Sequence, residues 1–176
     1  MKSIYAALIV VLVSLFTAAF AQTAAPASEA QTSFNRLKSL SGTWDGKVTT
    51  TPPAPEIDGT TMHVTLRTTS MGNAVVHEMT SPARKDDPIT MFYLENDKLM
   101  LTHYCDAGNR PRMTAKTSPD GKTLDFDFVD VMGNMQYGHM HHANFTIVDD
   151  NHHIEEWTYM AGDKPIRARI DLQRTK

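Results

Sequence analysis

Apolar and polar residues alternate along most of the chain from Thr43 onward. Leu124, Phe126 and Phe128, for example, alternate with Asp125 and other polar neighbours. A period of two is typical of a β-strand that has one face on a core. The same pattern predicts about ten strands, at residues 43–51, 60–69, 73–80, 88–95, 98–105, 110–116, 123–131, 138–148, 152–160 and 165–173.

Short polar segments separate nearly all of these strands. Gly, Asn, Asp and Pro are frequent in them, as in 71–73, 95–97, 119–121 and 149–151. Tight polar turns between strands indicate an antiparallel meander. An open meander has two unpaired edges, and closure removes them. We therefore expect an all-β fold, a single antiparallel up-and-down β-barrel of about ten strands, over residues 33–176.

A short N-terminal helix precedes the strands. Phe34, Leu37 and Leu40 have helical spacing, and Ser33 is a candidate N-cap, so two turns are predicted to end at residues 41–42. Residues 22–32 are rich in Ala, Ser and Thr and have no apolar period, which indicates a flexible tether.

The first residues have the pattern of a secretory signal. Lys2 precedes an apolar run at 6–20, and the small–bulky–small sequence at 19–21 matches a cleavage site. We expect a signal peptide at 1–21 and an exported protein, periplasmic or secreted, with no stable membrane insertion after cleavage. A retained N-terminal anchor is the alternative.

Charge and cysteine content exclude some classes of function. The formal net charge is −3, and without Lys2 the acidic excess is slightly larger, so no basic footprint for nucleic acid exists. The single cysteine, Cys105, cannot form an intramolecular disulfide. It is expected to be buried, to pair between chains, or to be used chemically.

The segment from Phe34 to Gly46, with Gly42-Thr43-Trp44-Asp45-Gly46 at its end, resembles the opening of the calycin superfamily: lipocalins, fatty-acid-binding proteins and nitrobindins. The sequence LTHYC at 101–105, followed by NRPR at 109–112, also resembles uncharacterised bacterial lipocalin-like domains. The resemblance implies a barrel whose closed end is plugged by Trp44 and whose cavity holds a small hydrophobic or amphipathic molecule.

Histidines are the main candidates for polar groups in such a cavity. The sequence GHMHH at 138–142 places His139 and His141 on one face of a strand, together with Ala143 and Phe145. His103 shares its face with Leu101 and Cys105. We therefore predict His103, His139 and His141 in the barrel interior, as ligand-binding residues.

The same three histidines form a candidate metal site. Three imidazole nitrogens suit Zn or Cu, with Glu78 or Glu156 as a fourth ligand. Plain hydrogen bonding by these histidines is the alternative interpretation.

Two further expectations come from the calycin resemblance. Nitrobindins bind haem through a histidine late in the chain, where this sequence has His152 and His153, but Val48 replaces the last glycine of their motif. Fatty-acid-binding proteins receive a carboxylate on a buried arginine, which Arg112 would supply here.

Signals for catalysis are weak. His103 and Cys105 are two apart on a strand, too far for direct proton transfer, and no phosphate loop, serine elbow or zincin helix is present. The sequence favours a binding protein over an enzyme. A metal-dependent enzyme and a filled barrel that acts as an interaction module remain the alternatives.

Overall fold

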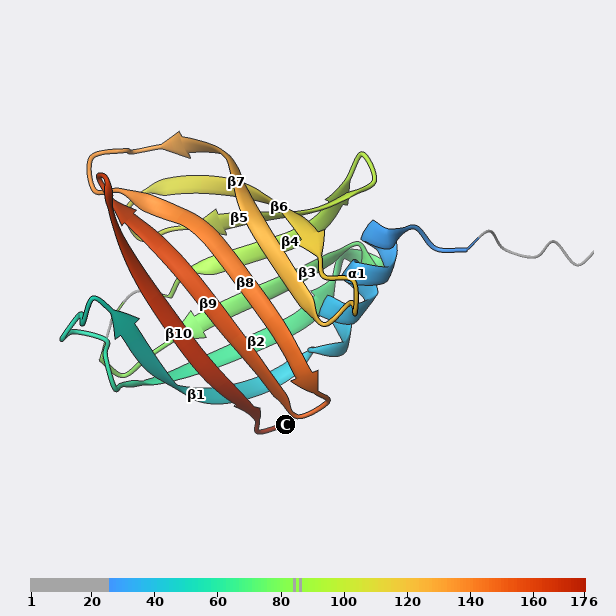
Figure 1. Ribbon diagram of the computed structural model, residues 1–176, viewed down its shortest axis with the longest axis horizontal. Coiled ribbons are helices and arrows are strands. Elements are labelled where there is room, and N and C mark those ends of the chain that lie inside the picture. Colours follow the sequence, from blue (N-terminus) through green and yellow to red (C-terminus); the bar gives the residue numbers. More distant parts are fainter. Residues whose placement is uncertain (1–25, 84, 86) are drawn as a thin grey trace, which may run out of the picture.

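In the part of the chain that the structure describes, ten antiparallel strands follow one short helix and close into a barrel (Figure 1), which confirms the predicted fold class. The computed structural model of the protein describes residues 26–83, 85 and 87–176. Its elements are α1 (Glu29–Ser39), β1 (Gly42–Thr51), β2 (Thr61–Thr69), a 3-10 turn η1 (Ser70–Gly72), β3 (Ala74–Thr80), β4 (Ile89–Glu95), β5 (Lys98–Tyr104), β6 (Asn109–Thr117), β7 (Thr123–Gly133), β8 (His139–Asp149), β9 (His152–Ala161) and β10 (Lys164–Arg174).

The predicted signal peptide at 1–21 lies outside the described residues. Within the described part of the chain, no helix has the length and apolar character needed to span a bilayer. Export therefore stays a prediction.

Each strand pairs with its neighbours in sequence, and the barrel closes where β1 pairs with β10. Trp44 pairs with Arg174 at one end of this seam, and Thr51 pairs with Arg167 at the other. Gly46 permits the close approach of the two strands, because a Cβ at this position would collide with the backbone carbonyl of Asp171. Closure pairs the two edge strands that an open meander would leave unpaired, as predicted.

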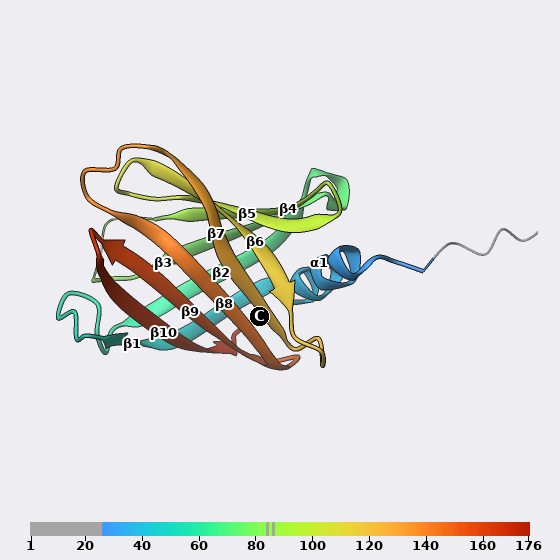
Figure 2. The same cartoon turned by 45° about the horizontal axis from the view of Figure 1, so that its top comes forward.

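The two ends of the barrel differ. Helix α1 lies across one end, beside the β2–β3, β4–β5 and β6–β7 connections (Figures 1 and 2). The β1–β2, β7–β8 and β9–β10 connections lie at the opposite end (Figure 2). One end is thus covered by a helix, and the other is formed by loops.

Helix α1 begins earlier than the sequence indicated. Ser28, not Ser33, is the N-cap, and its Oγ accepts a hydrogen bond of 3.2 Å from the backbone N–H of Gln31. Residues 29–32, expected in the tether, are therefore helical. Ser33 is buried and bonds to Thr117 Oγ1 at 2.6 Å, so its role is to join the helix to β6.

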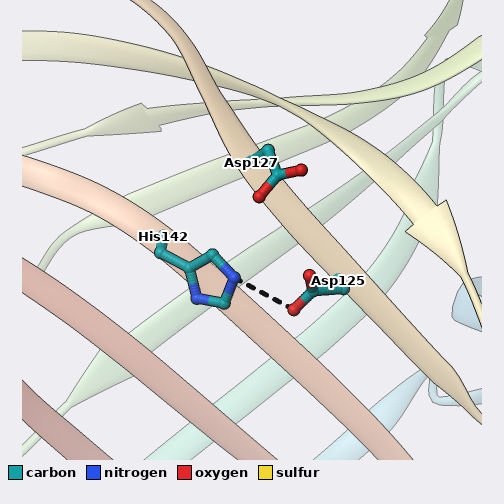
Figure 3. Close-up of side chains that lie close together, drawn as sticks. All are labelled: Asp125, Asp127 and His142. Atoms are coloured by element: carbon teal, nitrogen blue, oxygen red, sulfur yellow. Dashed lines mark ion pairs between the residues drawn. The ribbon is translucent and has the colours of Figure 1, made fainter.

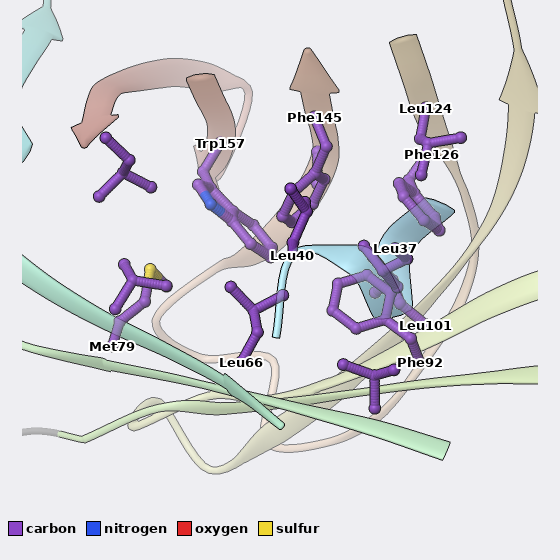
Figure 4. Packing of buried hydrophobic residues seen from close by; sticks show 14 of the residues in the cluster. Leu37, Leu40, Leu66, Met79, Phe92, Leu101, Leu124, Phe126, Phe145 and Trp157 are labelled. Carbon is purple, nitrogen blue, oxygen red and sulfur yellow. The ribbon is translucent and has the colours of Figure 1, made fainter. Parts of the chain in front are cut away.

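The apolar core fills the half of the barrel next to α1. Leu37 and Leu40 of the helix meet Leu66, Leu101 and the aromatic side chains of the barrel wall (Figure 4). The aromatic rings pack largely edge to face, with centroids of Phe92 and Phe145 5.4 Å apart. Among the described residues, the larger cavity beyond this packing lies toward the loop end.

A β-bulge interrupts strand β8. Met140 pairs with Tyr159 and His142 pairs with Thr158, so His141 is an extra residue without a partner of its own on β9. A bulge changes the alternation of side chains along its strand. The pattern that Ala143 and Phe145 establish is therefore not continued to His139.

Candidate functional site

A cavity of about 670 Å³ opens at the loop end of the barrel. Its rim comes from the connections β1–β2, β3–β4, β5–β6 and β7–β8, which contribute among others Ile57, Ser81, Asp106 and Tyr137. Most of the lining residues are apolar, and Trp157 is the largest of them. A volume of this size falls in the range of small-molecule sites, about 300–1,000 Å³.

His103 is the one histidine among the described residues that line the cavity. It belongs to an interior row across three neighbouring strands, in which His77 pairs with Thr90 and Thr90 pairs with His103. The Nδ1 atom of His103 lies 2.8 Å from Thr90 Oγ1, and the ring lies 5.4 Å from the Trp157 ring. The histidine predicted from LTHYC is thus in the interior, at the floor of the cavity.

His103 is neutral at physiological pH. Burial lowers the pKa of its imidazole to about 4, and the nearby His77 acts in the same direction, whereas Asp106 opposes them. A neutral imidazole has one N–H donor and one acceptor nitrogen. It can therefore form a hydrogen bond with a neutral ligand.

Beneath the cavity floor lies a buried carboxylate with three donors. Glu155 is fully buried and accepts hydrogen bonds of 3.0 Å from the Nε2 groups of His77 and His153 and from Trp157 Nε1. Burial by itself raises the pKa of Glu155, but attraction and hydrogen bonds from His77 and His153 outweigh it and hold the pKa well below its usual range. Glu155 is thus an interior anion.

This cluster connects opposite walls of the barrel. His77 is on β3, whereas His153, Glu155 and Trp157 are successive inward positions of β9, which is not adjacent to β3. The bond from Trp157 to Glu155 orients the indole that forms part of the cavity floor. The buried charge therefore positions the floor without lining the cavity itself.

The structure does not bring the predicted histidine trio together. His139 and His141 contact each other and Phe128, and neither lines the cavity. Met140, between them, lines it instead. The reason is the bulge at His141, because a strand pattern extended without a bulge puts these two side chains beside Ala143.

The two candidate glutamates lie on the outer face. Glu78 stands between His77 and Met79, which both point inward, so its side chain points outward and is half-buried. Glu156 is exposed and lies 3.7 Å from Arg169 Nη1. Neither belongs to a metal site with His103.

Arg112 is also outside the cavity. Its Nε and Nη2 atoms donate to the two carboxylate oxygens of Asp130 at 2.9 and 2.6 Å, and Nη1 is 3.7 Å from Glu95. The fork that would receive a ligand carboxylate is therefore occupied by Asp130.

Trp44 is at the closed end, fully buried, and its Nε1 donates to the backbone oxygen of Leu40 at 2.9 Å. The guanidinium of Arg174 covers the ring at 4.0 Å, and the His153 ring meets it edge-on at 4.2 Å. Trp44 joins the helix end to the barrel and does not line the cavity.

The two late histidines do not fit an axial haem ligand in the cavity. His153 is buried beneath the floor with Nε2 on Glu155, and His152 is paired with Asp171 at 2.9 Å on the outside. Neither ring lines the cavity. The expectation that one of them holds haem therefore has no support in this geometry.

One group of three metal-ligating side chains lies on the outer wall: Asp125, Asp127 and His142 (Figure 3), the single such group within the described ranges. His142 Nε2 is 3.0 Å from Asp125 Oδ1. Asp127 is already paired with Lys116 Nζ at 2.6 Å, and all three side chains are partly exposed. The ion pairs account for the arrangement.

Cys105 lines the cavity near its rim and is partly exposed. Its Sγ lies 3.3 Å from Asp106 Oδ1, which can accept the thiol hydrogen. Of the three alternatives given for this cysteine, burial is therefore contradicted.

The buried cluster of Glu155 and its three donors, His77, His153 and Trp157, was not predicted from the sequence. From the sequence, His153 is only a haem candidate, and Glu156, not Glu155, is a possible metal ligand. The signal that indicates the observed face is Trp157, because a tryptophan at position i+4 from His153 and i+2 from Glu155 favours burial of all three.

Comparison with known proteins shows similarity in fold to solved structures. No protein-family model matches the chain, and no curated protein matches it. The crystal structure of Rv2717c from M. tuberculosis aligns with a TM-score of 0.57 at 14% identity, covering 82% of this chain and 98% of that one. A protein of unknown function from the DUF3598 family of Nostoc punctiforme PCC 73102 aligns with a TM-score of 0.52 at 6% identity.

The second alignment covers 79% of this chain and 49% of the Nostoc protein, so this chain spans about half of its length. At such low identities the shared property is the fold. Both alignments agree with the closed ten-stranded antiparallel barrel of this chain.

Proposed function

We propose that the protein binds a small apolar or amphipathic molecule in the cavity at the loop end of the barrel. The observation that supports this proposal is a space of about 670 Å³ with mostly apolar walls and one neutral histidine on its floor. A deep apolar pocket with few polar groups is the usual form of a small-molecule site.

A cavity-filling variant tests the proposal. Ala168 of β10 lines the cavity, whereas its neighbour Arg167 is exposed on the outer face. Ala168→Trp should weaken binding of a neutral fluorescent probe such as N-phenyl-1-naphthylamine by about tenfold or more. Arg167→Trp adds the same side chain outside and should leave binding unchanged.

Circular dichroism and the urea midpoint verify that both variants are folded. Native mass spectrometry of the wild-type protein, with extraction of bound lipids, identifies a natural occupant. Equal probe binding by the wild type and by folded Ala168→Trp contradicts the proposal.

A second candidate function is metal binding by His139 and His141. Their Nε2 and Nδ1 atoms lie 3.2 Å apart, and with metal–nitrogen bonds of about 2.0–2.1 Å this separation gives a nitrogen–metal–nitrogen angle of about 100°, close to tetrahedral. Burial and the neighbouring His141 lower the pKa of His139, which favours the neutral ring that a metal requires. The Phe128 ring stacks on His141 at 4.6 Å and orients it.

Calorimetric titration of tag-free protein with Zn²⁺ or Cu²⁺ tests this second function. His139→Gln and His141→Gln should each abolish the site, and His63→Gln, which removes an exposed imidazole elsewhere, should not. If Asp127→Asn removes binding and the two histidine variants do not, the ion is at Asp125, Asp127 and His142, and the pair is not a site.

A further inference from the structure

The position of the proton on His103 follows from its contact with Thr90, the one hydrogen-bond partner of His103 among the described residues. The Thr90 side chain is fully buried, and in the described part of the chain its hydroxyl has one hydrogen-bond partner, His103 Nδ1 at 2.8 Å. Two arrangements satisfy this distance: the hydroxyl donates to Nδ1, or Nδ1–H donates to the hydroxyl oxygen.

The first arrangement is favoured by the cost of an unpaired donor. If Nδ1–H donates, the hydroxyl hydrogen of Thr90 remains buried without an acceptor, which costs about 1–3 kcal/mol. If the hydroxyl donates, no buried donor is lost, and the ring hydrogen is on Nε2. Since His103 lines the cavity, its remaining nitrogen is the one that the cavity contents can reach. Nε2 is not among the buried polar atoms that lack a partner, in contrast to Nδ1 of His77 and His153.

Other polar groups near the floor are already committed. Trp157 Nε1 donates downward to Glu155, and the Tyr159 hydroxyl donates to the backbone oxygen of Tyr137. The deep end of the cavity therefore offers an N–H donor within apolar walls.

We infer that the ligand of this cavity carries a hydrogen-bond acceptor oxygen, as in a ketone, ester or amide, which accepts from His103 Nε2–H, and that Thr90 is the positioning residue that fixes this tautomer. The inference rests on the proposed binding function and names the ligand class for it. It also weighs against His103 as an axial ligand of haem, because a metal needs the lone pair of the nitrogen that faces it, and this requires the other tautomer.

The tautomer is measured without any ligand. In uniformly ¹⁵N-labelled protein, the protonated and unprotonated imidazole nitrogens differ widely in chemical shift, and His103→Phe assigns the signals. At pH 7 we expect His103 Nε2 protonated and Nδ1 unprotonated. Thr90→Val should remove this preference, and Thr90→Ser, which keeps the hydroxyl, should restore it. The opposite tautomer in the wild type overturns the inference.

The ligand class is measured with a matched pair of probes. A long-chain methyl ketone and the alkane of equal length differ in one carbonyl oxygen. The wild type should favour the ketone, and His103→Phe should weaken ketone binding by about 3- to 10-fold, while alkane binding is unchanged or tighter. Thr90→Val should weaken ketone binding in the same direction, and Thr90→Ser should not.

The outcomes separate the two proposals. If the wild type binds neither probe, the binding function itself is contradicted. If it binds both and His103→Phe weakens them equally, the cavity is a site but the acceptor class is wrong. A Soret band that appears on haem addition and is lost in His103→Phe shows that His103 binds a metal from the cavity, which contradicts the proposed ligand class.

Discussion

Glu155 shows how a single carboxylate is retained in an apolar interior. A buried charge is costly unless donors surround it, and here three ring N–H groups do so at 3.0 Å. Two of them come from histidines whose Nδ1 atoms have no described hydrogen-bond partner. The cluster is therefore specified by Glu155, because each of its donors depends on this one acceptor.

Replacing this acceptor should destabilise the protein. Glu155→Gln presents an amide N–H₂ to the same three donors, so we expect a loss of about 3–5 kcal/mol in the free energy of unfolding. Glu156→Gln, one position further and exposed on the outer face, should change it by less than about 0.5 kcal/mol. Urea denaturation of the two variants makes the comparison, and similar losses would show that the buried cluster is not a stability element.

At this scale the sequence allowed only part of the site to be predicted. The alternation of 98–105 placed His103 inward, where the structure has it. The face of β3 was ambiguous, since Ala74 and Val76 are buried on one side and Val75 and His77 on the other. Local pattern cannot tell which of two apolar faces is the interior, and it contains no information about a bond between His77 and a residue 78 positions away.

Helix α1 is the element that closes the barrel opposite the cavity. Its Phe34, Leu37 and Leu40 side chains are at most 2% exposed, and Trp44 Nε1 bonds to the carbonyl at its C-terminal end. An isolated helix of this length is marginal in water, so packing on the barrel stabilises it.

Truncating the buried face of the helix tests this role. Leu37→Ala removes a side chain with no exposed area and should cost about 2–5 kcal/mol in unfolding free energy. Asn35→Ala, on the exposed face of the same turn, is the matched control and should be nearly neutral. Thermal and urea unfolding give both values, and an equal effect of the two changes would mean that the helix does not pack as described.

The elements were predictable to within a few residues, and their irregularities were not. The expected strand at 152–160 is β9 at His152–Ala161, and the expected strand at 123–131 is β7 at Thr123–Gly133. Periodicity and turn residues determine such segments directly. The bulge at His141 has no signal of its own, because it depends on the register that β9 imposes.

The whole barrel combines a filled half and a hollow half. The filled half holds the aromatic core, the buried Glu155 cluster and α1, and the hollow half holds the cavity and its loops. Global stability then depends on pH through His103, at the boundary between the two halves, and through Glu155 in the filled half.

Acid should destabilise the folded protein through His103. Its pKa is about 4 when folded and 6.5 when unfolded, so between these values the unfolded chain binds more protons. The free energy of unfolding should therefore fall as the pH decreases from about 7 to 4, by roughly 3 kcal/mol from this group. His103→Phe should reduce the fall and His63→Gln should not, as measured by urea titrations across this range.

The closed end of the barrel has a consequence for the kinetics of ligand exchange. A ligand bound at the floor of the cavity has one described route to solvent, because α1 and the aromatic core fill the other end of the barrel. The bound ligand must leave past the loops by which it entered before a second ligand can bind. A competing ligand cannot displace the bound one from the opposite side. The dissociation rate of the bound ligand should therefore be independent of the concentration of the competitor.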